Sequence, residues 1–242
     1  MKRYILIFLL GLLYSCKKEA DPEIPGGALY EVTAKGKLQK RLEYRNGRVS
    51  RVLAYSSCGT PYSIVEYGYN DGQITATRSG TRPLWSSWSG TPCDPDIALE
   101  YQNHTFQLDK QGRFSKVTGK YMTAVYEYSG QNATISIAYN DQNSSRISYV
   151  KFDGKGNVIE QSDADSGVFG IKRFEYDNNP NPMRGLNTYG LPDPFTCPNN
   201  VVRSLDSGGQ VLWERKFTYN DAGWPLTCHE DNGSVYEYHY NP

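Results

Sequence analysis

The stretch Phe217-Thr218-Tyr219-Asn220-Asp221-Ala222-Gly223-Trp224 contains the unit that this chain repeats. Its aromatic residues alternate with other side chains and lead into an Asn and a Gly, two residue types that favour turns. Related stretches occur at residues 67–74, 106–114, 126–135, 150–158 and 174–177. Because successive side chains of a strand point to opposite faces, each unit is predicted to form a strand and turn of a β-hairpin.

The same alternation extends over most of the chain from Leu29 onward. Tyr236, Tyr238 and Tyr240 alternate with Glu237 and His239, as expected of a strand with one buried and one wet face. Inward positions of this kind are predicted to form a tyrosine-rich core, and they include Tyr44, Tyr67, Tyr69, Tyr126, Tyr128, Tyr219 and Tyr238. This pattern predicts an antiparallel sheet.

Turn residues separate the alternating segments. Asn46-Gly47, Asp71-Gly72 and Asn232-Gly233 each predict a two-residue hairpin turn. Four other segments begin with Asp or Asn and have Gly as their fourth residue, which predicts four-residue turns with a left-handed exit: 109–112, 153–156, 206–209 and 220–223.

The predicted fold is all-β, an antiparallel meander of about fifteen short strands joined mostly by hairpins. A long meander must bury its apolar face and protect its edges, so we expect a barrel or a strongly coiled sheet. A two-sheet sandwich is the alternative architecture. Residues 28–242 are expected to form a single domain, interrupted by long loops at 80–95 and 177–200 that are either functional or cover a barrel end.

The N-terminus has basic Lys2 and Arg3, an apolar run, and then Leu13-Tyr14-Ser15-Cys16. This arrangement resembles a bacterial lipoprotein signal peptide, with a short signal anchor or a plain secretory signal as the alternative. The resemblance implies a signal peptide over residues 1–15, a lipid on Cys16, and membrane attachment through that lipid. Residues 16–27, rich in charge, Pro and Gly, are predicted to be a flexible tether.

Several repeat motifs resemble Rhs or YD repeats: Tyr-x-Tyr-Asn-Asp-Gly at 67–72, Phe-x-Leu-Asp-x-x-Gly-Arg at 106–113, and Phe-Asp-x-x-Gly-Asn at 152–157. The segment 176–183 is similar to one found in lipoproteins of Bacteroidetes-type bacteria that carry YD-like repeats and have no established function. This resemblance implies an outer-membrane lipoprotein, on the periplasmic face or the cell surface.

Four cysteines follow Cys16, namely Cys58, Cys93, Cys197 and Cys228. Thiols outside the cytoplasm are normally oxidised, so two disulfides are expected. Three pairings are possible. We favour Cys58 with Cys93 and Cys197 with Cys228, because each of these pairs brackets a few neighbouring strands.

Two tryptophans stand out as candidate ligand-binding residues. Trp85 and Trp88 belong to the loop at 80–95, where their rings could stack on a sugar or plug one end of the core. No spacing typical of a metal site or a phosphate-binding loop occurs, so neither a metal nor a cofactor is predicted. Lys plus Arg equals Asp plus Glu at 26 each, which argues against a nucleic-acid partner.

These features predict a lipid-anchored protein of the cell envelope that is not an enzyme, and that binds a glycan or another envelope protein. A purely structural partner of a larger assembly is a further possibility. The alternative is a carbohydrate-active hydrolase whose catalytic carboxylates lie in the loops, since only their spatial separation would identify them.

Overall fold

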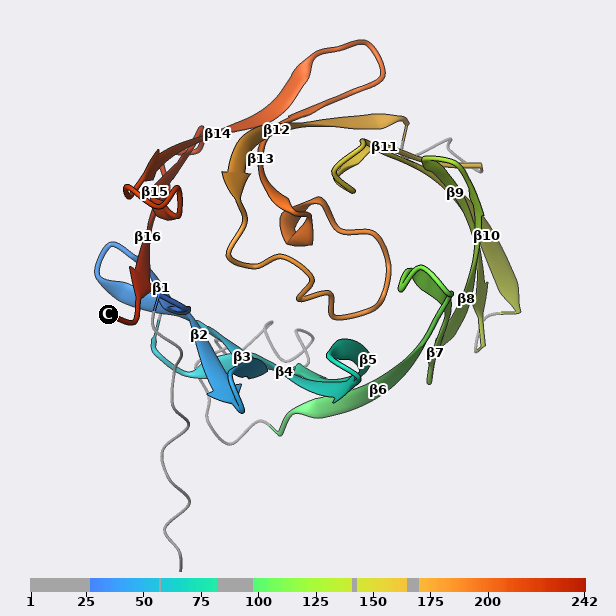
Figure 1. Cartoon of the computed structure of the whole chain (residues 1–242), viewed down its shortest axis with the longest axis horizontal. Coiled ribbons are helices and arrows are strands. Elements are labelled where there is room, and N and C mark those ends of the chain that lie inside the picture. Colours follow the sequence, from blue (N-terminus) through green and yellow to red (C-terminus); the bar gives the residue numbers. More distant parts are fainter. Residues whose placement is uncertain (1–26, 57, 82–97, 141–142, 165–169) are drawn as a thin grey trace, which may run out of the picture.

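The computed structural model describes residues 27–56, 58–81, 98–140, 143–164 and 170–242. Within these ranges, sixteen strands follow one another around a closed antiparallel barrel, and each strand pairs with its neighbours in the sequence (Figure 1). β1 (Leu29–Ala34) pairs with β16 (Val235–Tyr240) and closes the ring. The predicted all-β meander is therefore confirmed in its barrel form, and the sandwich alternative is wrong.

The first eight strands between these two are β2 (Lys37–Arg45), β3 (Arg48–Tyr55), β4 (Pro61–Asn70), β5 (Gln73–Thr81), β6 (Glu100–Leu108), β7 (Phe114–Gly119), β8 (Met122–Ser129) and β9 (Asn132–Tyr139). The remaining strands are β10 (Ser144–Phe152), β11 (Val158–Asp163), β12 (Lys172–Pro180), β13 (Asn199–Leu205), β14 (Val211–Tyr219) and β15 (Pro225–Glu230). A single-turn 3₁₀ helix, η2 (Pro194–Thr196), lies between β12 and β13.

Side chains on the strands alternate between the lumen and the outer surface. In β9, Ala133, Ile135 and Ile137 are buried in the lumen while Ser136 and Ala138 are exposed. The tyrosines predicted to face inward follow the same rule, because Tyr44 and Tyr126 are buried, and Tyr67, Tyr128 and Tyr238 pack against the buried clusters. The period of two read from the sequence thus places the aromatic residues inside the barrel.

The four-residue turns form as predicted, and the side chain of the first residue organises each of them. In the turn after β13, Oδ1 of Asp206 accepts hydrogen bonds from the backbone N–H groups of Gly208 (2.9 Å) and Gln210 (2.8 Å). Gly209 has φ +84°, the left-handed conformation that glycine adopts at low cost. Asp109, Asp153 and Asn220 accept the same pair of backbone hydrogen bonds in their own turns.

Two of the three predicted two-residue turns are confirmed. Asn46 and Gly47 both have positive φ, as do Asp71 and Gly72. The prediction for Asn232-Gly233 is wrong, because β15 and β16 pair His229 with Val235 and so leave a longer loop. Glu230 opens a four-residue turn there, with its N–H donating to the carbonyl of Ser234 at 2.9 Å.

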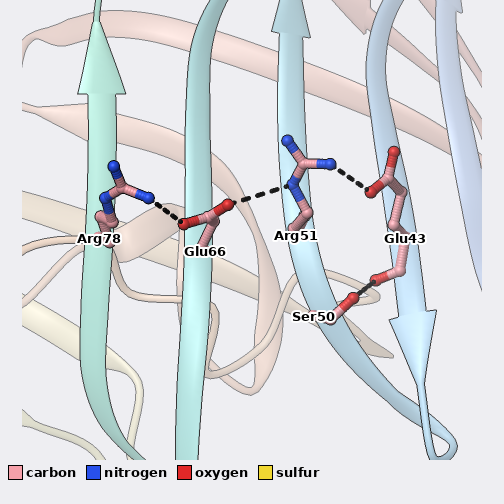
Figure 2. Close-up of polar contacts among 5 residues, drawn as sticks. All are labelled: Glu43, Ser50, Arg51, Glu66 and Arg78. Atoms are coloured by element: carbon pink, nitrogen blue, oxygen red, sulfur yellow. Dashed lines mark hydrogen bonds and ion pairs between the residues drawn. The ribbon is translucent and has the colours of Figure 1, made fainter. Parts of the chain in front are cut away.

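The outer face of β2–β5 carries a row of alternating charges (Figure 2). Arg51 lies opposite Glu43 on one side and Glu66 on the other, at 3.1 Å and 3.6 Å, and Arg78 is 3.3 Å from Glu66. Each exposed pair contributes only about 0–1 kcal/mol. The row still favours the observed register, because a one-residue slip would turn these charges into the lumen. A second group of outward ion pairs spans β11–β14 through Glu160, Arg173, Glu175, Arg203 and Glu214.

We predict that Asp206→Ala lowers the free energy of unfolding by about 1–2 kcal/mol, because two backbone N–H groups lose their acceptor. Asp206→Asn is the matched control and should cost much less, since Asn220 accepts the equivalent bonds in its own turn. Urea denaturation of both variants measures the difference. Equal losses in the two variants would contradict this role for the side chain.

Candidate functional site

Residues 181–198 leave the barrel wall after β12, enter the lumen and return to the wall at β13. We call this segment the plug; it is the orange stretch inside the ring in Figure 1. The sequence predicted that a loop over 177–200 would be functional or would cover a barrel end. The loop fills the interior and packs against both clusters of buried side chains, Leu186 and Met183 in one and Leu191 and Cys197 in the other.

Hydroxyl groups on the wall hold the middle of the plug. Tyr67 of β4 donates to the carbonyl of Leu186 at 3.2 Å, and Thr77 of β5 donates to that of Thr188 at 2.6 Å. Tyr126 of β8 donates to the carbonyl of Gly190. The three carbonyls belong to alternate residues and are bound by three separate strands. Buried carbonyls that would otherwise lack partners are satisfied in this way.

Gly190 lies close against the wall of the barrel. It has φ +68°, and a Cβ at this position would lie 2.5 Å from Cγ2 of Val117 and 3.0 Å from the ring of Phe106. Real Cβ atoms do not approach other atoms so closely, so this position has room for glycine alone. Tyr189 beside it packs edge-on against the buried His104, with ring centroids 5.3 Å apart.

Buried asparagines fix the base of the plug. Nδ2 of Asn181 donates to the carbonyls of Phe195 (2.8 Å) and Cys197 (2.9 Å), which ties the start of the plug to its end. Asn157, the last residue of the motif at 152–157, exchanges two hydrogen bonds with Asn199, both 3.0 Å long. Since a buried amide without partners would cost free energy, this network specifies one position for the plug.

The plug divides the lumen into two chambers. The aromatic chamber, about 550 Å³, lies between the plug and the wall formed by β7–β11. Its wall includes Phe114, Phe152 and the stacked rings of Tyr126 and Tyr128, whose centroids are 6.1 Å apart. Burial raises the pKa of Tyr128 to about 12, so its hydroxyl stays protonated at neutral pH.

The charged chamber, about 510 Å³, lies on the other side of the plug, against β2–β5 and β13–β16. Three charged side chains line it: Lys40 from β2, Arg215 from β14 and Asp193 from the plug. Arg215 is already neutralised by Glu230, 2.5 Å away, and its guanidinium lies 4.5 Å from the ring centroid of Phe195. Aromatic rings complete the wall, among them Tyr62, Tyr67, Phe217, Tyr236 and Tyr238.

Lys40 and Asp193 have unusual electrostatic surroundings. Lys40 remains accessible to water in the lumen, yet protein atoms surround it, and this desolvation lowers the pKa of its ammonium group against the opposing effect of Asp193. Burial raises the pKa of Asp193, while the N–H of Phe195 and the charge of Lys40 act against that rise. Among the described residues, the Lys40 side chain has no hydrogen-bond or ion-pair partner, so the three N–H donors of its ammonium group are available to a ligand.

Several predicted site residues lie outside the described residues: Cys16, Trp85, Trp88 and Cys93. Lipidation of Cys16 and the role of the two tryptophans therefore stay predictions. Cys58 lies between β3 and β4 and is not a free thiol. Its pairing with Cys93 stays a prediction as well.

The predicted disulfide between Cys197 and Cys228 is wrong, because both residues are free thiols. Cys197 lies at the end of the plug in the wall of the aromatic chamber, whereas Cys228 on β15 faces the charged chamber. The prediction was based on the few strands that separate the two cysteines in the sequence. Burial raises the pKa of Cys197, and raises that of Cys228 to about 11, so both thiols are held in the unreactive protonated form.

Sequence reasoning missed Lys40, Asp193 and Arg215. The sequence did contain a signal for Lys40. It lies two residues before Leu42 and four before Tyr44, so the alternation along β2 places all three side chains on the inner face. Nothing in the sequence indicated Asp193, whose position depends on the path of the plug.

In the part of the chain that the structure describes, no group of three or more His, Cys, Asp or Glu side chains is placed to hold a metal ion. Among the same residues, no helix is long and apolar enough to cross a membrane.

We predict that Gly190→Ala destabilises the protein by more than Gly185→Ala. Both glycines belong to the plug and have positive φ, but a Cβ at Gly185 would meet nothing within 4 Å. The matched pair therefore separates the clash with Val117 from the backbone strain, which is about 1 kcal/mol or more in each. Thermal unfolding of both variants measures the difference. Equal destabilisation would show that the plug does not press against the wall at this point.

We also predict that Cys197 and Cys228 resist alkylation in the folded protein and react once it is unfolded in guanidinium without a reductant. Peptide mapping identifies the labelled residues, and Cys197→Ser and Cys228→Ser should each remove one label. Failure of both residues to react after unfolding would mean that they are joined in a disulfide.

No family model matches this chain, and no curated protein matches it. Among solved structures, a porin-like protein from Bacteroides uniformis is 15% identical, with 86% of this chain and 82% of that chain covered at a TM-score of 0.33.

Proposed function

We propose that this protein is a non-enzymatic binding protein of the bacterial cell envelope that holds a small polar ligand in the charged chamber. The observation that carries the proposal is the combination, in one cavity of about 510 Å³, of an ammonium, a carboxylate and several aromatic faces. Cavities of this size, with mostly apolar walls and a few polar groups, are typical of small-molecule sites.

The chemistry of the chamber favours a sugar or a similar molecule with one apolar face. Tyr62, Tyr236 and Tyr238 offer ring surfaces against which a pyranose can pack. Lys40 offers donors and Asp193 offers acceptors for hydroxyl groups. Opposite charges on the wall and the plug favour a neutral ligand with several hydroxyls over a strongly charged one.

The outer face of the barrel supports a location beside the membrane rather than across it. Arg51, Arg78 and Arg203 project outward from the wall, each half-exposed and paired with carboxylates. At the centre of a bilayer, a lipid-facing Arg costs about 2–4 kcal/mol, and membrane barrels carry an apolar outer band instead. A barrel surrounded by water and held by a lipid on Cys16 accounts for these charges. Trp85 and Trp88 would then be a second place for glycan contact.

The binding of neutral, amino and acidic mono- and disaccharides to the full chain in detergent, measured by titration calorimetry, tests this proposal. Lys40→Met keeps the aliphatic stem but removes the charge, and should weaken binding at least about tenfold, which corresponds to roughly 1.4 kcal/mol. Lys116→Met is the matched control, because Lys116 lies on the outer face of β7 and should leave affinity unchanged. Absence of binding across the panel, or equal affinities for the two variants, would contradict the proposal.

One observation favours the alternative of a carbohydrate-active hydrolase. Asp153 and Asp193 both line the aromatic chamber, and their environments move their pKa values in opposite directions, downward for Asp153 and upward for Asp193. Both oxygens of Asp153, however, already accept hydrogen bonds within its own turn. Release of reducing sugar from the disaccharides, lost in Asp193→Asn, would support the hydrolase instead.

A further inference from the structure

A third cavity lies beside the hairpin turns that join β2 to β3 and β4 to β5, and it shares Tyr67 with the wall of the charged chamber. Its volume is about 710 Å³, and its lining is mainly polar. Three arginines contribute to it, Arg45, Arg48 and Arg51, together with Tyr69 and one carboxylate, that of Glu66, which is paired with Arg51 and Arg78. We call it the rim cavity.

Two of these arginines face each other without compensation. Arg45 and Arg48 are direct cross-strand partners in the β2–β3 ladder, on either side of the Asn46-Gly47 turn. Like charges placed directly opposite each other destabilise a sheet. Among the described residues, neither makes an ion pair, whereas Arg41, Arg51 and Arg78 on the same group of strands all do.

The neighbouring hairpin holds Arg48 in place. Its guanidinium carbon lies 5.6 Å from the ring centroid of Tyr69, and the Tyr69 hydroxyl donates to the carbonyl of Val49 at 2.8 Å. Nη2 of Arg48 also lies 3.2 Å from the point that a Cβ on Gly72 would occupy. Arg48 thus reaches from its own turn to the next one, so part of the entropy cost of ordering its side chain is already met.

A third donor lies in the same lining. Nε of Arg51 is buried and has no hydrogen-bond partner, because the Glu66 carboxylate is 3.6 Å away, beyond hydrogen-bonding distance. A buried donor without an acceptor has a free-energy cost. An acceptor supplied by a ligand would relieve this cost.

We propose that the rim cavity binds an oxyanion, a phosphate or sulfate group, between Arg45 and Arg48. Guanidinium groups present rigid forks of N–H donors that match the oxygens of such groups, and two forks meeting at one cavity can grip a tetrahedral anion from two sides. The anion would remove the repulsion between the two arginines. The same chemistry is offered by free phosphate or sulfate and by phosphate esters, including a lipid headgroup.

Thermal unfolding of the full chain in detergent, at constant ionic strength, tests this site with chloride, inorganic phosphate, sulfate or glycerol phosphate as the anion. Phosphate or sulfate should raise the midpoint of the native protein relative to chloride. The double variant Arg45→Gln/Arg48→Gln should lose this response and weaken phosphate binding, measured by calorimetry, at least about tenfold. A larger response to glycerol phosphate than to inorganic phosphate would identify an ester as the source, and the reverse would identify the free anion.

The control is Arg41→Gln/Arg78→Gln, which removes the same charge from the same strands but from arginines that already have carboxylate partners. It should keep the full response to phosphate. In chloride, Arg45→Gln/Arg48→Gln should be at least as stable as the native protein because the repulsion is gone, so a loss of response cannot come from unfolding. Equal responses in the two double variants, or no response in the native protein, would overturn the proposal. Lys40→Met should leave the phosphate response intact, which separates this site from the charged chamber.

Discussion

The width of the lumen is the constraint on which the rest of this structure depends. A closed barrel widens with each added strand, and sixteen strands enclose more space than the side chains of the wall can fill. A lumen left open would expose its apolar and aromatic side chains to water. Residues 181–198 meet this constraint by folding inward, and three hydroxyl groups of the wall donate hydrogen bonds to backbone carbonyls of this segment. The two chambers are the volume that the plug leaves between itself and the wall.

The repeat motifs have a second role beyond turning the chain. Asp153 organises its own turn, and Asn157 at the end of the same motif holds the base of the plug through Asn199. Asp177 accepts hydrogen bonds from Asn200 and from the hydroxyl of Tyr219, which belongs to the repeat at 217–224. The residues of the repeat motifs therefore both form the turns and fix the position of the plug. Because Asp193 belongs to the plug, they also fix its position in the walls of both chambers.

Most ion pairs of the barrel and most of its buried aromatic residues lie on opposite faces of the wall. The row of ion pairs from Glu43 to Arg78 lies on the outer face (Figure 2), and buried aromatic residues such as Phe106 and Tyr126 face the lumen. Arg215, which is paired with Glu230, is a charged residue that lines the charged chamber. Two cysteines remain as buried thiols because the plug carries Cys197 away from the strand that bears Cys228. Burial of hydroxyl and thiol groups keeps them protonated, so the lumen offers neutral donors beside a few separated charges.

The sequence by itself determined the strands, their two faces and most of the turns, because these depend on neighbours two to four residues apart. It placed Tyr44 and Tyr126 inside and indicated Gly47, Gly72 and Gly209 as turn residues. Only the tertiary structure decided that the sheet closes with sixteen strands, that the loop after β12 enters the lumen, and that Lys40 meets Asp193 there. Those outcomes depend on contacts between residues far apart in the chain, about which the spacing of side chains along one strand carries no information.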